Sequence, residues 1–132
     1  MDDFTTSDEG VLKKLLGIKP NGYPPILNEY DLLDLSLNPS NFAVNWLIHR
    51  DNRDNIKYHY FCMNENDKAI DFLLKTFKDG TWHDKIFPGF LHKNKNPRAQ
   101  RLIDIYVSKC GFDNRQQLID HYHKDLNEPL II

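Results

Sequence analysis

The sequence predicts an α+β domain in which a small antiparallel sheet is flanked by four to five helices. Residues 42–63 form two β-rich runs on either side of a short polar stretch, which is typical of a β-hairpin. Other segments space their apolar residues three and four apart, which is typical of amphipathic helices. Asp and Asn are abundant, and because they cap helices and form turns, short and sharply bounded elements are expected.

Length, charge and cysteine content narrow the class of protein. The 132 residues suit a single domain, 1–132, and no internal repeat is expected. The net charge of −2 excludes a strongly basic nucleic-acid coat and a strongly acidic nucleic-acid mimic. Cys62 and Cys110 lie far apart in apolar runs, which indicates free thiols in a reducing compartment. Without an apolar leader or membrane span, we expect a soluble, cytoplasmic monomer, and delivery to a host cytosol stays open.

The first third of the chain contains one clear helix and one ambiguous segment. Thr6 or Ser7 can cap a helix that runs through Leu16. Residues 19–22, Lys-Pro-Asn-Gly, are expected to form a turn, and Tyr23-Pro24-Pro25 cannot start a central strand because the two prolines lack N–H donors. Residues 26–37 fit a strand and a helix about equally well.

The hairpin at 42–63 is expected at the centre of the sheet. Residues 42–50 and 56–63 form its strands, and the five residues 51–55 form its turn. If Arg50 pairs with Ile56, cross-strand partners share a face and bring four polar side chains together. These are Asn45, His49, Lys57 and His59.

Three further helices are expected, over residues 66–79, 97–110 and 114–124. Each follows an Asn or Asp that can cap it, and the first two end at glycine. Residues 81–96 are expected to be irregular, and the tail 127–132 to add an edge strand or to pack on the core.

The sequence lacks the motifs of common enzymes, so no catalytic residue, metal or cofactor is expected. There is no nucleophile elbow, phosphate-binding glycine loop or Cys-x-x-Cys pair. His121 and His123, if helical, point about 200° apart and do not converge on one ion. His83 and Asp84 near Trp82 could form an acid–base pair, but solvated loop residues are the simpler interpretation.

A basic stretch interrupts this acidic chain at residues 92–101, which contain no acid. Lys93 and Lys95 precede a helix N-terminus, which also favours anions, and Arg98 and Arg101 share one helix face. The stretch indicates either an anion or phosphate site or a solvated helix face, and the sequence does not decide between them.

Two segments resemble Src homology 2 domains. Residues 112–122, Phe-Asp-Asn-Arg-Gln-Gln-Leu-Ile-Asp-His-Tyr, are similar to the family's second helix, and residues 56–61, Ile-Lys-Tyr-His-Tyr-Phe, to one of its strands. The resemblance implies a phosphotyrosine-binding fold in which residues 64–110 form a large helical insertion. The family's phosphate-binding Arg is missing, since the matching stretch 23–28 reads Tyr-Pro-Pro-Ile-Leu-Asn.

The resemblance implies a non-catalytic recognition module that binds phosphorylated peptides, including phosphotyrosine peptides. His59 would line the phosphotyrosine pocket, and other cations would replace the missing Arg. The residues expected to bind phosphate and peptide are His59, Lys57, His49, Asn45, Arg50, Lys93, Lys95, Arg98 and Arg101.

Two alternatives belong to other classes. The chain could be a small protein-binding inhibitor or adaptor that blocks a larger enzyme, with Trp82, Phe87 and Phe90 exposed and no phosphate site. It could also bind nucleic acid through a helix-turn-helix at 97–124, although Asp120 and Asp125 make the second helix a poor groove binder.

Overall fold

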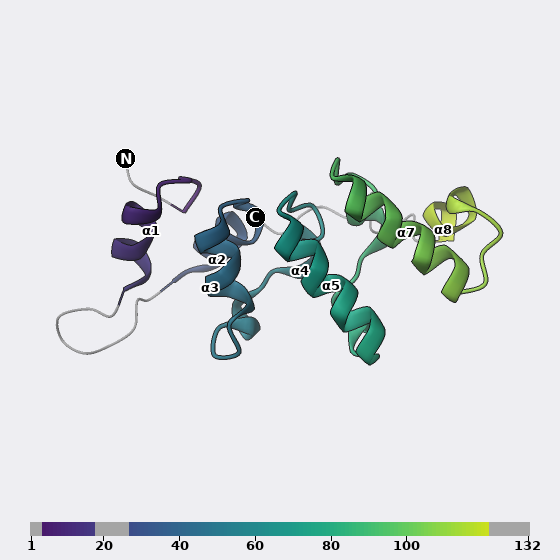
Figure 1. Cartoon of the computed structure of the whole chain (residues 1–132), viewed down its shortest axis with the longest axis horizontal. Coiled ribbons are helices and arrows are strands. Elements are labelled where there is room, and N and C mark those ends of the chain that lie inside the picture. Colours follow the sequence, from purple (N-terminus) through teal and green to yellow (C-terminus); the bar gives the residue numbers. More distant parts are fainter. Residues whose placement is uncertain (1–3, 18–26, 122–132) are drawn as a thin grey trace.

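The computed structural model describes residues 4–17 and 27–121, and within them every regular element is a helix (Figure 1). The predicted α+β class is therefore wrong, because no strand occurs in these ranges. The α-helices are α1 (Glu9–Leu16), α2 (Glu29–Leu37), α3 (Asn41–Ile48), α4 (Tyr58–Phe61), α5 (Asp67–Asp79), α6 (Pro88–Leu91), α7 (Pro97–Lys109) and α8 (Arg115–His121). Two 3₁₀ turns are η1 (Arg53–Asn55) and η2 (Trp82–Asp84). The expected turn at 19–22 and the tail at 127–132 lie outside the described residues.

The predicted hairpin is the main error, because its two strands are helices α3 and α4. Helix α3 buries Ala43, Val44 and Leu47, a spacing of one and three that defines one helical face. Phe42 and Trp46 are also apolar but only partly buried. With Val44 between them they give the alternation of apolar and other residues that is typical of a strand. The ambiguous segment at 26–37 is settled as helix α2 by a capping box between Asn28 and Asp31.

The helices stack in sequence along the long axis of the molecule (Figure 1). Helix α3 lies between α1 and α5, and α5 in turn packs against α7. The other helices form a second row, in which α2 contacts α4 and α6 contacts α8. This arrangement is a stack of helical units, each contacting its neighbours, as in repeat proteins.

The stack reveals an internal repeat that we did not expect from the sequence. Each unit consists of a helix of the second row, a buried asparagine, a helix of the first row and the connection that follows it, so that η1 belongs to the first unit and η2 to the second. The asparagines Asn38, Asn64 and Asn94, which we call the asparagine ladder, are 26 and 30 residues apart. Each is followed two residues later by the N-cap of the next helix, Ser40, Asn66 or Asn96.

The asparagine ladder joins each unit to the one before it. The side-chain amide of Asn64 donates to the carbonyl oxygens of Ser36 and Asn38, at 3.0 and 2.9 Å. Its Oδ1 accepts from the backbone N–H of Asn66 at 2.9 Å. The other two members repeat this pattern: Asn94 donates to Cys62 and Asn64, and Asn38 donates to Phe4 and Thr6. Because all three are buried, these bonds satisfy polar groups that would otherwise be costly.

The N-cap asparagines form a second set of bonds between units at the surface. The amide of Asn66 donates to the Pro39 carbonyl at 2.7 Å and to Asn41 Oδ1 at 2.8 Å. The amide of Asn96 repeats this one unit later, toward the Glu65 carbonyl and Asp67 Oδ1. The same residues therefore cap helices and tie neighbouring units together.

The hydrophobic core follows the same register as the asparagine ladder. Three positions relative to each asparagine are almost fully buried: three residues before it, five after it and nine after it. They are Leu35, Phe61 and Leu91; Ala43, Ala69 and Ala99; and Leu47, Leu73 and Ile103. All nine belong to the same cluster of buried apolar residues, so one continuous core runs through the stack.

The ladder ends within the described residues on both sides. Ahead of the first unit Thr6 takes the corresponding position, two residues before the N-cap Asp8, and its hydroxyl accepts from the Asp8 N–H at 3.1 Å. At the last unit the side-chain amide of Gln100 donates to the carbonyls of Asn94 and His92, at 2.7 and 3.4 Å. Arg115 then covers Gln100, donating to its Oε1 at 2.6 Å and to its carbonyl at 2.8 Å.

Candidate functional site

The structure separates the residues of the expected phosphate site. His59 lies in α4, where its ring stacks on Phe87 with centroids 3.7 Å apart and meets the edge of Phe90 at 5.1 Å. Lys57 pairs with Glu29, with Nζ and Oε2 2.6 Å apart. His59 and Lys57 thus contact different residues, and they do not line one anion pocket together.

The expected partners on α3 and its C-terminal end lie apart from His59. Asn45 Oδ1 is 3.5 Å from Lys68 Nζ, and His49 Nδ1 accepts from the Asp51 N–H at 3.2 Å. Arg50 is exposed, with Nε 3.9 Å from Asp51 Oδ1. The shared face expected from strand pairing does not exist, because these segments form helices.

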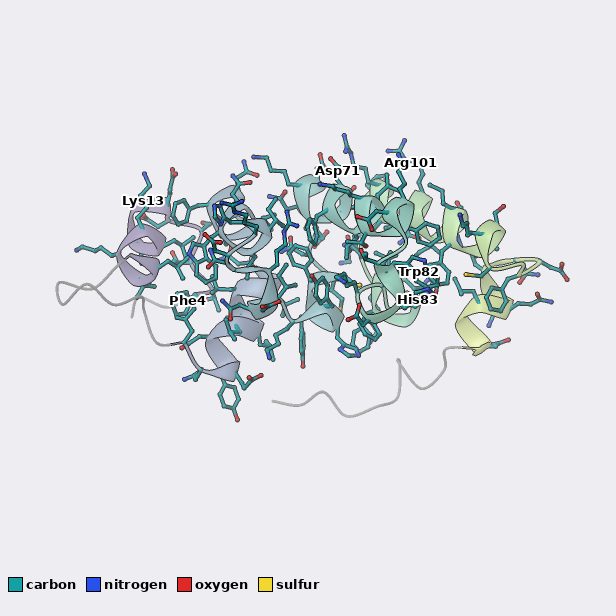
Figure 2. The ribbon with its side chains drawn as sticks, turned by 90° about the horizontal axis from the view of Figure 1, so that it is seen from below. Phe4, Lys13, Asp71, Trp82, His83 and Arg101 are labelled. Carbon is teal, nitrogen blue, oxygen red and sulfur yellow. The ribbon has the colours of Figure 1, made fainter. Side chains whose placement is uncertain are left out.

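The basic stretch at 92–101 is partly neutralised. Arg98 donates to Asp71 Oδ1 at 2.6 Å and also lies near Asp67. Lys93 Nζ lies 5.6 Å from the Phe90 ring centroid, and Lys95 is exposed. Arg101 and Asp71 both line a shallow groove between α5 and α7, along one edge of the molecule (Figure 2).

The aromatic side chains that the inhibitor or adaptor alternative expects on the surface are buried or partly buried. Phe90 is buried, and Phe87 and Trp82 are partly buried. The Trp82 ring stacks on Phe77 and on His83, with centroids 5.3 and 4.0 Å away. Figure 2 labels Trp82 and His83 side by side. These rings stabilise the stack instead of forming a free surface.

The described residues contain no grouping suited to metal or nucleophilic chemistry. No three His, Cys, Asp or Glu side chains among them gather so that they could hold a metal ion. Burial raises the pKa of the Cys110 thiol, which disfavours the reactive thiolate. The suspected pair of His83 and Asp84 is divided, because Asp84 binds Lys85 and His83 stacks on Trp82.

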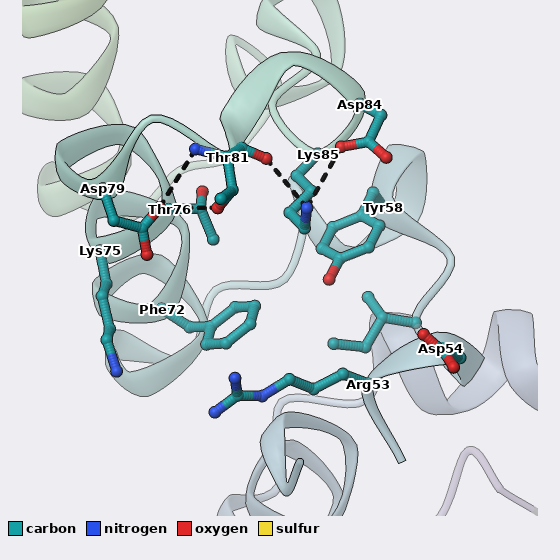
Figure 3. Close-up of a pocket in the computed structure, with 11 residues that line it drawn as sticks. Arg53, Asp54, Tyr58, Phe72, Lys75, Thr76, Asp79, Thr81, Asp84 and Lys85 are labelled. Carbon is teal, nitrogen blue, oxygen red and sulfur yellow. Dashed lines mark hydrogen bonds and ion pairs between the residues drawn. The ribbon is translucent and has the colours of Figure 1, made fainter. Parts of the chain in front are cut away.

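A cavity of about 590 Å³ opens where two successive units meet, between η1, α4, α5 and η2 (Figure 3). We call it the inter-unit cavity. Its lining residues are Arg53, Asp54, Ile56, Tyr58, Phe72, Lys75, Thr76, Asp79, Thr81, Asp84 and Lys85. None of the residues expected to bind phosphate lines it.

Two aromatic side chains, together with Ile56, form the apolar part of the inter-unit cavity. The Phe72 ring and the Tyr58 hydroxyl both point into it (Figure 3). Burial, followed by the nearby Asp84 carboxylate, raises the pKa of Tyr58 to about 12. The phenol is therefore protonated at neutral pH and can donate a hydrogen bond to a bound group.

Hydrogen bonds hold the upper rim of the cavity in place. Lys85 Nζ donates to the Thr81 carbonyl at 2.9 Å and to Asp84 Oδ1 at 3.2 Å. Asp79 Oδ1 accepts from the hydroxyl and the N–H of Thr81, at 2.6 and 3.1 Å. These contacts lower the pKa of both carboxyl groups, so both stay ionised at neutral pH.

At the lower rim, contacts with a backbone carbonyl and an aromatic ring hold the Arg53 side chain in place. Its Nε donates to the Ile48 carbonyl at 2.7 Å, and its guanidinium carbon lies 5.1 Å from the Phe72 ring centroid. Lys75 extends from α5 on the other side of Phe72 (Figure 3). The cavity can thus offer an aromatic wall, a phenol donor and preoriented charges to one ligand.

Sequence reasoning missed the inter-unit cavity because its residues come from segments with ordinary local roles. The sequence predicts a hairpin turn for Arg53 and Asp54 and places Lys75 in the expected helix at 66–79, where nothing marks it as a binding residue. The spacing of Asn38, Asn64 and Asn94 was the signal that could have placed η1 and η2 in successive units.

Comparison of the chain with protein-family models, curated proteins and solved structures finds no match. The resemblance to Src homology 2 domains is thus neither supported nor refuted by a relative, while the sheet that it implied is absent from the described residues. No helix in those residues has the length and apolar character needed to cross a membrane.

Proposed function

We propose that the chain is a non-catalytic recognition module that binds a peptide segment of another protein in the inter-unit cavity. The observation that supports this proposal is a cavity built across two stacked units, with Tyr58 and Phe72 facing its interior. Stacked helical repeats commonly present such surfaces for protein partners.

The lining of the inter-unit cavity favours a peptide over a small apolar ligand. Small-molecule pockets are lined mostly by apolar side chains. Here three cations and three carboxylates surround the two rings: Arg53, Lys75, Lys85, Asp54, Asp79 and Asp84. A peptide supplies both backbone groups that can bind polar rims and a side chain that can cover the rings.

Recognition of phosphorylated peptides, which the sequence led us to expect, remains part of this proposal in a changed form. The residues first expected to bind phosphate are divided among several elements and engage their own neighbours. A phosphate-binding role would therefore depend on the cations of the inter-unit cavity.

A selection from a random peptide library tests the proposed function. The full chain is used to select 12-residue peptides, and their affinities are measured by titration calorimetry. We expect selected peptides to bind Tyr58→Ala about tenfold more weakly, since the side chain supplies both ring contact and a donor. Tyr30→Ala is the matched control, because this tyrosine is 56% exposed on α2 and does not line the cavity.

The proposal fails if no peptide is enriched, or if the selected peptides bind Tyr58→Ala as tightly as the unchanged chain. Circular dichroism of each variant shows whether it is folded. Tyr58→Phe provides a second variant that keeps the ring and removes only the hydroxyl, so a folding defect in Tyr58→Ala does not end the test.

A further inference from the structure

The cations of the inter-unit cavity differ in how they are engaged. Lys85 is bound by the Thr81 carbonyl and by Asp84. Within the described residues, neither Arg53 nor Lys75 has a carboxylate oxygen within 4.0 Å. Both lie at the lower rim: in Figure 3 the Lys75 side chain runs down from α5 beside Phe72, and the Arg53 side chain runs beneath the Phe72 ring toward the same side of the cavity.

Arg53 is preoriented for binding an anion. The bond from Nε to the Ile48 carbonyl and the contact with Phe72 fix the guanidinium plane, while its two terminal nitrogens form no hydrogen bond within the described residues. A planar guanidinium that presents two terminal N–H groups matches the geometry of a carboxylate or phosphate. Less side-chain entropy is lost on binding, because the protein already holds the side chain.

The carboxylates of the cavity do not occupy this rim. Asp79 accepts two hydrogen bonds from Thr81, and Asp84 is bound to Lys85. Asp54 lies on the opposite side of the Arg53 side chain from Lys75 (Figure 3). The rim between Arg53 and Lys75 therefore carries two positive charges that form no ion pair in the described part of the chain. The influence of Lys75 on a carboxylate is to lower the pKa of Asp79, in addition to the larger effect of the hydrogen bonds from Thr81.

We propose that Arg53 and Lys75 form an anion subsite of the inter-unit cavity, which receives a carboxylate or phosphate group of the bound peptide. The proposal rests on the peptide-recognition function proposed above and adds the chemistry of the side chain that is recognised. The neighbouring Phe72 ring contacts the aliphatic or aromatic part of that side chain.

Titration of the ¹⁵N-labelled full chain, followed by NMR, tests the anion subsite with defined probes. The probes are phenyl phosphate, acetyl-Ala-Glu-Ala-amide and the neutral acetyl-Ala-Gln-Ala-amide. We expect one or both anionic probes to shift the amide signals of residues 53 and 72–76, and the neutral peptide to leave them unchanged. Binding of the phosphate alone identifies a phosphorylated side chain, and binding of the Glu peptide identifies an acidic one.

Three variants provide the controls. Arg53→Gln and Lys75→Gln are each expected to weaken binding of the anionic probe about tenfold, because each removes charge-assisted hydrogen bonds. Lys78→Gln removes an exposed cation from the same helix without touching the cavity lining, and is expected to change nothing. Lys75 is itself exposed, so its replacement leaves the core intact even if Arg53→Gln disturbs η1.

The anion subsite is overturned if neither anion shifts these signals, if the Gln peptide shifts them equally, or if both variants bind as tightly as the unchanged chain. This failure is distinguishable from failure of the proposed function. Library-selected peptides that depend on Tyr58 but not on Arg53 or Lys75 would overturn the subsite and leave peptide recognition in place.

Discussion

The side-chain amide of Gln100 lies 2.7 Å from the carbonyl oxygen of Asn94, in the position where the amide of a following ladder asparagine would donate. In each earlier unit the corresponding carbonyl accepts from the next asparagine, as Asn64 does from Asn94. Gln100 therefore closes the asparagine ladder with a residue of the same unit. Its position in α7 corresponds to the buried Val44 and Ile70 of earlier helices, so a polar residue replaces an apolar one at this end of the stack.

Removal of the Gln100 amide is expected to destabilise the protein. Gln100→Ala leaves the Asn94 carbonyl without its donor and Arg115 without its Oε1 acceptor, at a cost of about 1–2 kcal/mol in the free energy of unfolding. Urea unfolding measures this change. Gln116→Ala, which removes a surface contact with Asp120, should change stability by less than about 0.5 kcal/mol.

A second substitution at Gln100 separates hydrogen bonding from packing. Gln100→Leu restores an apolar residue like Ile70 but cannot donate to the two carbonyls. We expect it to be destabilising as well. A variant that is more stable than the unchanged chain would show that the closing bonds of the ladder are unimportant.

Loss of a central ladder asparagine should have a larger effect. Asn64→Ala removes two donors to buried carbonyls and one acceptor for the Asn66 N–H, and we expect the free energy of unfolding to fall by about 2–4 kcal/mol. Chemical denaturation checks this value. The control is Asn45→Ala, an exposed residue whose side chain forms, within the described residues, a single hydrogen bond of 3.5 Å with Lys68. A loss of stability no larger for Asn64 than for Asn45 would contradict a structural role for the ladder.

The end of α5 depends on a glycine in a left-handed conformation. Gly80 has a φ of 84°, and no atom lies within 4 Å of the position that a Cβ would take. Gly80→Ala should therefore cost about 1 kcal/mol through backbone strain alone. Gly80→Asn should cost less, because Asn adopts this conformation more readily. Equal thermal stability of the Ala variant and the unchanged chain would contradict this expectation.

Tyr58 is expected to make stability fall at high pH. Its pKa is about 12 in the folded chain and near 10 when unfolded, so the unfolded phenol ionises first. Between pH 10 and 12 the folded state holds one proton more than the unfolded state, and the free energy of unfolding decreases as pH rises. We expect Tyr58→Phe to show a smaller decrease in unfolding experiments over this range. The same slope in both proteins would exclude Tyr58 as its source.

Local sequence signals predicted several helices correctly. The expected helices at 66–79 and 97–110 agree with α5 and α7 to within one residue at each end. Asn66 and Asn96 cap them as expected, Pro97 opens the second, and Gly80 ends the first. These signals are reliable because a cap is satisfied within three residues of the chain, whatever the rest of the fold does.

The sequence by itself determined where the longer helices begin and end, whereas the tertiary structure decided what lies between them and what they build. The four residues of α4 are too few to show a helical period, and their aromatic side chains favour a strand. They form a helix because they pack against α2, a contact that the local sequence does not show. Asn38, Asn64 and Asn94 resemble turn residues locally, because the carbonyls that bind them lie 26–34 residues away in the chain. The inter-unit cavity likewise depends on contacts between distant parts of the chain, since Arg53 and Lys75 come together at one rim only when successive units stack.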